Sequence, residues 1–282
     1  MGKFESDFKR RDFLKTSFAV GTLASLKLNA GITGVVGGAA LLFVLLKGGI
    51  LLSVFLLLAG IIMSLELNNA FKKIGIKINL IAMLIGCAVI FLEYFVKMPE
   101  IVSLFAVLLV AFLFVLLTDD HTVQDGIYTV FSFLYAPFLL STLRHMDKSP
   151  FLILVFILAF GTDTFAYFVG VKFGKHKLIP KVSPKKSVEG AVGGIVGSLL
   201  LSLIFMYFTK INITWATIPF LILASIASEI GDLVASKLKR YAGIKDFGNI
   251  LPGHGGVLDR FDSIILVSPV IYFAFEVLKE VI

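Results

Sequence analysis

The sequence has little charge and almost no cysteine. Only 16% of its 282 residues are charged, whereas 58% are hydrophobic, and its mean hydropathy is +0.97. These values exclude an ordinary soluble domain and indicate a chain that crosses a membrane several times. The single cysteine, Cys87, excludes an internal disulfide and a thiolate metal cluster. The formal charge of +7 suits contact with anionic headgroups, but the soluble basic face that nucleic-acid binding requires is absent.

Familiar catalytic loop motifs are also missing. Gly170-x-x-x-Gly174-Lys175 is one residue short of a Walker A loop and lacks its Ser/Thr. There is no Gly-x-Ser-x-Gly elbow, so His254 among its glycines is not a hydrolase oxyanion loop. A row of small residues instead predicts close packing between two membrane helices. This row consists of Gly190, Gly193, Gly194 and Gly197.

Long apolar runs predict an all-α, polytopic integral membrane protein with about nine transmembrane helices. The runs lie near residues 32–46, 50–65, 78–96, 101–117, 127–143, 151–171, 191–208, 216–235 and 263–278. We divide the chain into a basic N-terminal cytoplasmic segment (1–31), N-terminal transmembrane helices (32–150) and a C-terminal catalytic transmembrane region with a cytoplasm-facing site (151–282).

The distribution of basic residues predicts that the N-terminus lies inside and the C-terminus outside. Nine spans create five inner segments, which are 1–31, 66–77, 118–126, 172–190 and 236–262. They hold 20 of the 26 Lys and Arg residues, and the opposite orientation would invert this bias. We therefore expect a multi-pass protein of the cell (inner) membrane whose active site faces the cytoplasm.

Two polar stretches carry minor hypotheses. Residues 10–15, Arg-Arg-Asp-Phe-Leu-Lys, resemble a twin-arginine export motif. We favour a basic amphipathic segment on the cytoplasmic surface, because a multi-spanning protein does not need that export route. Four polar groups near residue 120 could bind a metal, but we expect a solvated inner loop there. They are Asp119, Asp120, His121 and Asp125.

The charge that the chain does have is concentrated between Ser228 and Asp262. In a helix, five polar residues of this part would share one face. They are Ser225, Ser228, Asp232, Ser236 and Lys239. Gly243 is placed to end that helix with a left-handed cap. The turn-forming Leu-Pro-Gly-His-Gly-Gly that follows leaves backbone N–H groups free to face an anion.

Carboxylates within this stretch favour a functional site. Asp259 and Asp262 stand three residues apart where the last apolar run begins, so both can point into one space. The alternative is a cytoplasmic loop whose charges are simply solvated. Intramembrane carboxylates are energetically expensive and usually functional, so we favour a site that binds phosphate and metal together.

The same residues resemble a known signature. Ser236-x-x-Lys239-Arg240, Lys245-Asp246-x-Gly248 and Pro252-Gly-His254-Gly-Gly-x-x-Asp259-Arg260-x-Asp262 are similar to the phosphatidate cytidylyltransferases, or CDP-diacylglycerol synthases. A second block agrees, with Asp163-Thr-x-Ala-Tyr167-x-x-Gly170 and Ser183-Pro-Lys-Lys-Ser187-x-Glu189-Gly190. The resemblance is strong over about residues 161–268. The chain departs from the pattern at Ala235, where an acidic residue is common, and at Phe247, where a small one is usual.

This resemblance implies that CTP and phosphatidate react to give CDP-diacylglycerol and pyrophosphate. The two substrates bring together on the order of five to six negative charges, so the site needs a divalent metal and several fixed cations. Asp232, Asp259 and Asp262 are the best ligands for Mg²⁺, and Asp163 is a fourth candidate. Glu229 is a weaker candidate, and the site leaves room for a second cation.

We assign roles to the remaining polar residues on the same basis. The expected catalytic residues are Asp232, Lys239, Arg240, Asp259 and Asp262. The expected substrate- and phosphate-binding residues are Ser183, Lys185, Lys186, Ser187, Ser236, Lys245, His254 and Arg260. Three alternatives stay open. His254 could only shape a turn, Asp163 could make a buried hydrogen bond to a Thr or Tyr, and the 183–187 segment could be a headgroup-contacting loop.

The expected partners are CTP, phosphatidate in the bilayer, the lipid membrane itself, and a second copy of the chain in a homodimer. No nucleic acid is expected. Related reactions remain open, because lipid-facing helices do not distinguish one long-chain lipid from another. A CDP-archaeol synthase or a polyprenol kinase would use CTP in a similar site. An ion-coupled transporter is a more distant alternative, because the polar residues gather in one half of the chain and at one membrane face.

Overall fold

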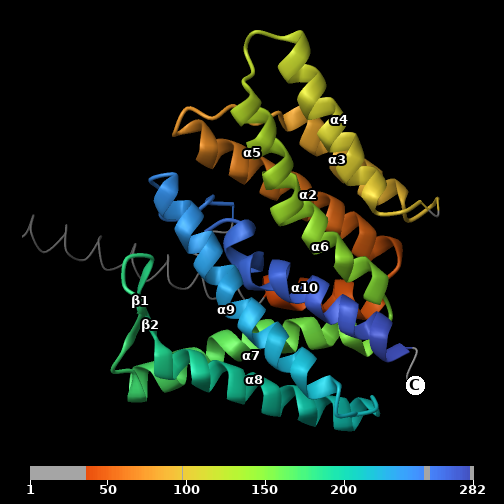
Figure 1. Ribbon diagram of the computed structural model, residues 1–282. Coiled ribbons are helices and arrows are strands. Elements are labelled where there is room, and N and C mark those ends of the chain that lie inside the picture. Colours follow the sequence, from red (N-terminus) through yellow and green to blue (C-terminus); the bar gives the residue numbers. More distant parts are fainter. Residues whose placement is uncertain (1–35, 97, 251–254, 280–282) are drawn as a thin grey trace, which may run out of the picture.

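The protein is described by a computed structural model that covers residues 36–96, 98–250 and 255–279. It is a helical membrane protein (Figure 1). Within these ranges, five helical segments are long and apolar enough to span a membrane. They are Ile50–Lys72, Val123–Met146, Pro150–Phe173, Val188–Thr209 and Thr217–Tyr241. The expected helical class is confirmed, whereas nine spans and the N-in/C-out orientation stay predictions. The basic segment 1–31 lies outside the described residues.

The N-terminal half is a layered bundle of α2 (Ile50–Lys72), α3 (Leu80–Leu92), α4 (Ile101–Leu117) and α5 (Val123–Phe133) (Figure 1). A shorter apolar helix, Val36–Lys47, precedes α2. After α5 the chain continues through a π-helical turn, η1 (Leu134–Phe138), then α6 (Leu139–Ser141) and the 3-10 turn η2 (Thr142–Met146). Pro137 lies inside η1. Proline lacks an N–H and crowds the preceding turn, which accounts for the wider helical turn at this point.

Asp125 is buried rather than solvated, which corrects the expectation for this residue, whereas Asp119 and Asp120 are exposed as expected. Its carboxylate accepts hydrogen bonds from the backbone and hydroxyl of Thr122 (both 2.8 Å), forming a capping box at the start of α5. Its other oxygen accepts from the backbone N–H of Lys77 (2.7 Å). The sequence shows the polar character of this stretch but not its long-range partner. The contact joins two segments that the basic-residue distribution places on the same side.

The C-terminal half contains α7 (Pro150–Phe173), α8 (Val188–Thr209), α9 (Thr217–Tyr241) and α10 (Leu258–Lys279). Helices α7 and α8 lie side by side along their whole length (Figure 1). A Cβ atom on Gly194 would lie 2.8 Å from the carbonyl oxygen of Thr162, and one on Gly190 would lie 2.8 Å from that of Ala166. The predicted packing role of the glycine row is therefore confirmed.

A β-hairpin joins α7 to α8, so the all-α expectation was wrong in this segment. Strand β1 (Lys177–Ile179) pairs antiparallel with β2 (Ser183–Ser187), with Lys177 opposite Ser187. Pro180 and Pro184 account for the difference, since proline interrupts a helix but is tolerated in turns and exposed strands. The predicted inner loop is thus an ordered flap that stands beyond the helix ends (Figure 1).

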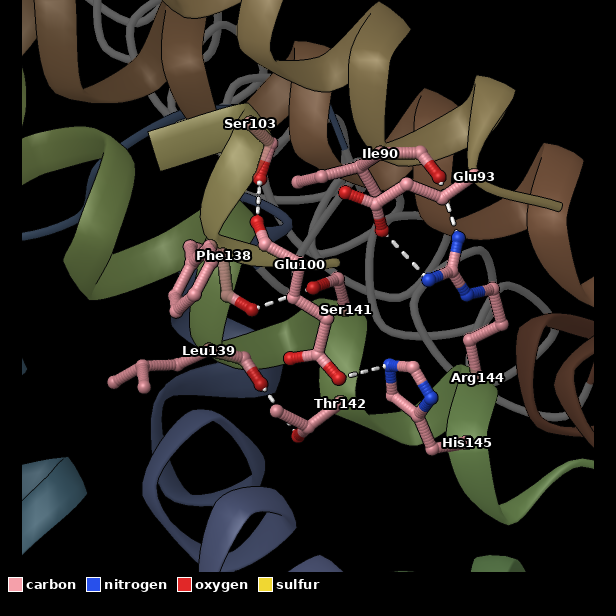
Figure 2. A network of polar contacts seen from close by, with 10 residues as sticks. All are labelled: Ile90, Glu93, Glu100, Ser103, Phe138, Leu139, Ser141, Thr142, Arg144 and His145. Atoms are coloured by element: carbon pink, nitrogen blue, oxygen red, sulfur yellow. Dashed lines mark hydrogen bonds and ion pairs between the residues drawn. The ribbon is translucent and has the colours of Figure 1, made fainter. Parts of the chain in front are cut away.

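At the opposite end of the bundle, ion pairs hold the α3–α4 connection against η2 (Figure 2). Arg144 donates to the carbonyl oxygen of Ile90 and to Glu93, both at 2.6 Å. His145 Nε2 lies 2.5 Å from Glu100 Oε1. The Glu93 side chain is only 1% exposed, so removing Arg144 would leave a buried charge without its partner.

Candidate active site

A cavity of about 490 Å³ lies between α7, the hairpin, α8 and α9. Carboxylates form one wall of it and basic side chains of the hairpin form another. The charged lining residues are Asp163, Lys177, Lys185, Lys186, Glu229 and Asp232. Tyr167 and Val171 also line the cavity and are 66% and 71% exposed on the outside of the helix bundle. The cavity therefore adjoins a surface that is apolar enough to contact lipid.

The polar face predicted for α9 is confirmed. Ser225 and Ser228 are fully buried, while Ile226 and Ile230, on another face of the helix, are exposed. The hydroxyl of Ser225 lies 2.8 Å from that of Ser198 on α8. This face directs Asp232, one turn after Ser228, toward the cavity. Helix α9 ends at Tyr241, and Gly243 has a φ of +66°, so the left-handed position expected after the helix is present.

Lys186 extends from β2 to two carboxylates of α9. Its ammonium nitrogen lies 2.6 Å from Glu229 Oε2 and 2.8 Å from Asp232 Oδ2. Burial alone would lower the pKa of Lys186, but the charges of Asp232 and Glu229 outweigh it and raise the pKa to about 12. The side chain is therefore a permanent cation inside the cavity. Its expected contact with phosphate stays a prediction.

Asp259 organises the loop between α9 and α10. Its Oδ1 pairs with the ammonium of Lys239 (2.7 Å), and its Oδ2 accepts from the backbone N–H groups of Phe247 (2.8 Å) and Gly256 (2.9 Å). The side chain of Asp259 is 3% exposed. Both carboxylate oxygens thus have protein partners. The Lys239 nitrogen also lies 5.6 Å from the centre of the Phe247 ring, which gives this departure from the family pattern a packing role.

The predicted convergence of Asp232, Asp259 and Asp262 on one metal ion stays a prediction. In the described ranges no three Asp, Glu, His or Cys side chains are already grouped closely enough to hold a metal. Asp259 is paired with Lys239 and with two backbone N–H groups, which sequence spacing could not reveal. Asp262 instead lies within electrostatic range of Asp232 and Asp163. The Asp163 carboxylate accepts from Ser263 (3.3 Å) rather than from a Thr or Tyr.

The other predicted site residues are distributed around this centre. Ser187 is buried and caps α8 by accepting from the N–H of Gly190 (3.1 Å). Ser183 and Ser236 are half-buried on β2 and α9. Four of the predicted phosphate-binding or catalytic residues are exposed basic side chains, namely Lys185, Arg240, Lys245 and Arg260. His254 lies outside the described residues.

Residues 29–278 match the sequence profile of the cytidylyltransferase family. The chain belongs to this family. A Staphylococcus aureus (strain COL) protein named phosphatidate cytidylyltransferase is 32% identical over 248 residues, which cover 85% of this chain and 95% of the relative. A Staphylococcus saprophyticus protein of the same name is 35% identical over the same shares. A Bacillus subtilis protein of that name is 34% identical over 61% of this chain and 66% of its own length.

Two buried groups of this cytidylyltransferase-family chain were missed by sequence reasoning. Glu66 of α2 accepts hydrogen bonds from the N–H groups of Val257 and Leu258, both at 2.8 Å, at the start of α10. The hydroxyl of Tyr135 in η1 is buried without a hydrogen-bond partner in the described part of the chain and lies within electrostatic range of Asp262, Asp232 and Asp259. A single acidic residue inside an apolar helix was the available signal for Glu66. Tyr135 gave no comparable signal.

Proposed function

We propose that the protein transfers the cytidylyl group of CTP to phosphatidate and releases pyrophosphate, producing CDP-diacylglycerol for phospholipid synthesis. The main structural support is the cavity, which is lined by cations of the hairpin and by carboxylates of α7 and α9. Its border includes Tyr167 and Val171, which are exposed on the apolar outer surface. A cavity of this kind can admit a water-soluble nucleotide and a membrane lipid together. Family membership and the names of the relatives support the same reaction.

The reaction requires little acid–base chemistry from the protein. A phosphate oxygen of phosphatidate would attack the α-phosphorus of CTP, and the bond from that phosphorus to the bridging oxygen of pyrophosphate would break. The attacking phosphomonoester is mostly dianionic near pH 7 because its second pKa is about 6. The protein must mainly align the reactants and neutralise charge. Lys186 is a fixed cation in the cavity, and Lys177 and Lys185 lie on the same hairpin wall.

Mg²⁺ is the proposed metal, with room for a second cation. The donors are of the type that Mg²⁺ prefers, because Asp163, Asp232 and Asp262 offer carboxylate oxygens within electrostatic range of one another; metal binding would have to draw these side chains closer together. Oε1 of the neighbouring Glu229 is buried and has no hydrogen-bond partner among the described residues. Bound there, Mg²⁺ would supply charge neutralisation for the phosphates of CTP. We therefore replace Asp259 by Asp163 in the proposed ligand set and give Asp259 the task of holding the loop.

We further propose that this site faces the cytoplasm of a cell whose inner membrane holds the protein. Contacts between predicted inner segments support a common side. The backbone N–H of Lys77 donates to Asp125 and so joins segments 66–77 and 118–126. The N–H of Val257 donates to Glu66 and so joins segments 236–262 and 66–77. Homodimerisation through membrane helices belongs to the same proposal, with the exposed apolar outer face of α8 as one surface that could carry it.

The test is an assay of purified protein with CTP labelled in the cytidine ring, Mg²⁺ and a panel of lipid phosphates and lipid alcohols. Phosphatidate should yield labelled CDP-diacylglycerol and one equivalent of pyrophosphate. Turnover of another lipid phosphate in preference to phosphatidate would redirect the proposal to that lipid. Release of CDP together with a phosphorylated alcohol would identify a kinase and contradict the proposed reaction. The absence of CTP consumption with every lipid would also contradict it.

A further inference from the structure

Glu66 reaches from the N-terminal half of the chain to the first turn of α10. Its Oε1 accepts from the N–H of Val257 and its Oε2 from the N–H of Leu258, both at 2.8 Å. The residue is 2% exposed. The first N–H groups of a helix have no partner within the helix and carry partial positive charge, so a carboxylate satisfies them well. This contact fixes α10 immediately before Asp259 and Asp262.

The surrounding loop leaves just enough room for the Glu66 carboxylate. A Cβ atom on Gly256 would lie 2.5 Å from Oε1 and 2.8 Å from Oε2. A Cβ on Gly248 would also lie 2.5 Å from Oε1. The backbone at both ends of the loop is therefore packed directly on the carboxylate. Gly256 additionally donates to Asp259, so Glu66 and Asp259 hold the same short stretch of backbone from opposite sides.

A purely structural cap does not need this residue. Among the described residues Glu66 forms no ion pair, and a buried carboxylate without a cation is an expensive way to satisfy two backbone groups. Neutral Ser, Thr or Asn side chains cap helices at lower desolvation cost. A charged group here contributes something that a neutral cap would not, namely a rigid placement of the loop that precedes the site aspartates.

We propose that Glu66 is a positioning residue for nucleotide binding. It holds the backbone of residues 248 and 256–258 so that Arg260, in the first turn of α10, meets the phosphates of CTP in a fixed arrangement. This inference rests on the proposed CTP-dependent reaction. It places one determinant of CTP affinity on α2, far in sequence from the motifs of the C-terminal half.

The first test compares Glu66→Gln with a matched control, Glu93→Gln. Glutamine keeps the size of Glu66 but offers one acceptor and an NH₂ group where two backbone donors require two acceptors. We expect KM for CTP to rise about tenfold while KM for phosphatidate stays near that of the wild type. Glu93 is also buried but pairs with Arg144 at the opposite end of the bundle. Glu93→Gln should lower the melting temperature in detergent without changing either KM.

The second test uses Gly256→Ala, alone and with Glu66→Ala. The φ of Gly256 is not positive, so alanine conflicts with Glu66 rather than with the backbone. The single Gly256→Ala variant should lose about tenfold in kcat/KM for CTP. The double variant should be no worse than Glu66→Ala, because the clash disappears with the carboxylate. If Glu66→Ala does not fold, the comparison of Gly256→Ala and Glu66→Gln with the wild type still decides the question.

Unchanged KM for CTP in Glu66→Gln, with only a lower melting temperature, would overturn the positioning role and leave a structural cap. Additive losses in the double variant would also contradict it. Neither result would contradict the proposed function, which fails only if the wild-type protein does not convert CTP and phosphatidate.

Discussion

The ammonium nitrogen of Lys239 lies 2.7 Å from Oδ1 of Asp259 and ties the last turns of α9 to the first turn of α10. Each residue taken alone resembles a direct contact to substrate or metal. Together they form a buried pair that also holds the backbone of Phe247 through the second carboxylate oxygen. The pair therefore shapes the loop between the two helices, and its loss should differ from the loss of a metal ligand.

Substitutions of Lys239 and Asp259 should have non-additive effects on activity. Lys239→Met and Asp259→Asn are each expected to lower activity by a factor of ~10² and to lower the melting temperature, because either change leaves a buried group without its partner. Raised Mg²⁺ should not restore Asp259→Asn. The double variant should be about as impaired as the worse single variant. Multiplicative losses, or recovery of Asp259→Asn in high Mg²⁺, would argue for independent roles.

Asp262→Asn should behave as a loss of metal affinity. The carboxylate of Asp262 lies near Asp232 and Asp163 and is not paired with Lys239. Activity should fall by a factor of ~10² at limiting Mg²⁺ and recover in part when Mg²⁺ is raised, since a hard-ion ligand has been removed. Titration of activity against Mg²⁺ for the wild type and Asp262→Asn provides the measurement. An unchanged Mg²⁺ requirement would exclude Asp262 from the metal site.

Tyr135→Phe should separate activity from stability. The Tyr135 hydroxyl is buried without a hydrogen-bond partner among the described residues, so its removal should leave the melting temperature unchanged or raise it slightly. The same hydroxyl lies within electrostatic range of Asp262 and Asp232, and we expect it to donate to a phosphate bound beside them. The expected loss in kcat is about tenfold, less than the ~10² or more that follows removal of one oxyanion-hole donor. Wild-type kcat in Tyr135→Phe would mean that the hydroxyl has no part in the reaction.

The Glu100–His145 contact predicts a pH-dependent contribution to stability (Figure 2). The hydrogen bond from His145 lowers the pKa of Glu100 below its ordinary value. A lowered folded-state pKa gives stability that is present above the unfolded-state pKa of about 4.3 and is lost as the pH falls through the folded-state value. Glu100→Gln should therefore melt below the wild type at about pH 5, and the difference should shrink below about pH 4. A difference that grows on acidification would reverse the assigned sign.

The helical class and the inward face of α9 followed from local features of the sequence. Apolar runs set the helices, and the three- and four-residue spacing of Ser225, Ser228 and Asp232 set the inward face of α9. The left-handed position of Gly243 also followed from local chemistry. These features depend on neighbours within a few residues, which a sequence displays directly.

The partners of the buried charges could not be obtained in this way. Spacing brought Asp259 and Asp262 onto neighbouring turns but did not show that Asp259 would pair with Lys239. Glu66 and Leu258 are separated by 192 residues, and no periodicity connects them. The hairpin at residues 177–187 was missed because its strands are too short to display a clear alternation of apolar and polar side chains.

The bonds from Val257 and Leu258 to Glu66 have a consequence for the order in which the molecule matures. Helix α2 leaves the ribosome before α10, because synthesis runs from the N-terminus. Until α10 docks, Glu66 lacks its two backbone donors from Val257 and Leu258, and Asp259 is not in place beside Lys239. The growing chain thus carries unpaired acids between its helices until α10 has been made and has docked. A chain that stops before α10 is left with an exposed intramembrane carboxylate, the kind of defect by which quality-control proteases can tell unfinished membrane proteins from finished ones.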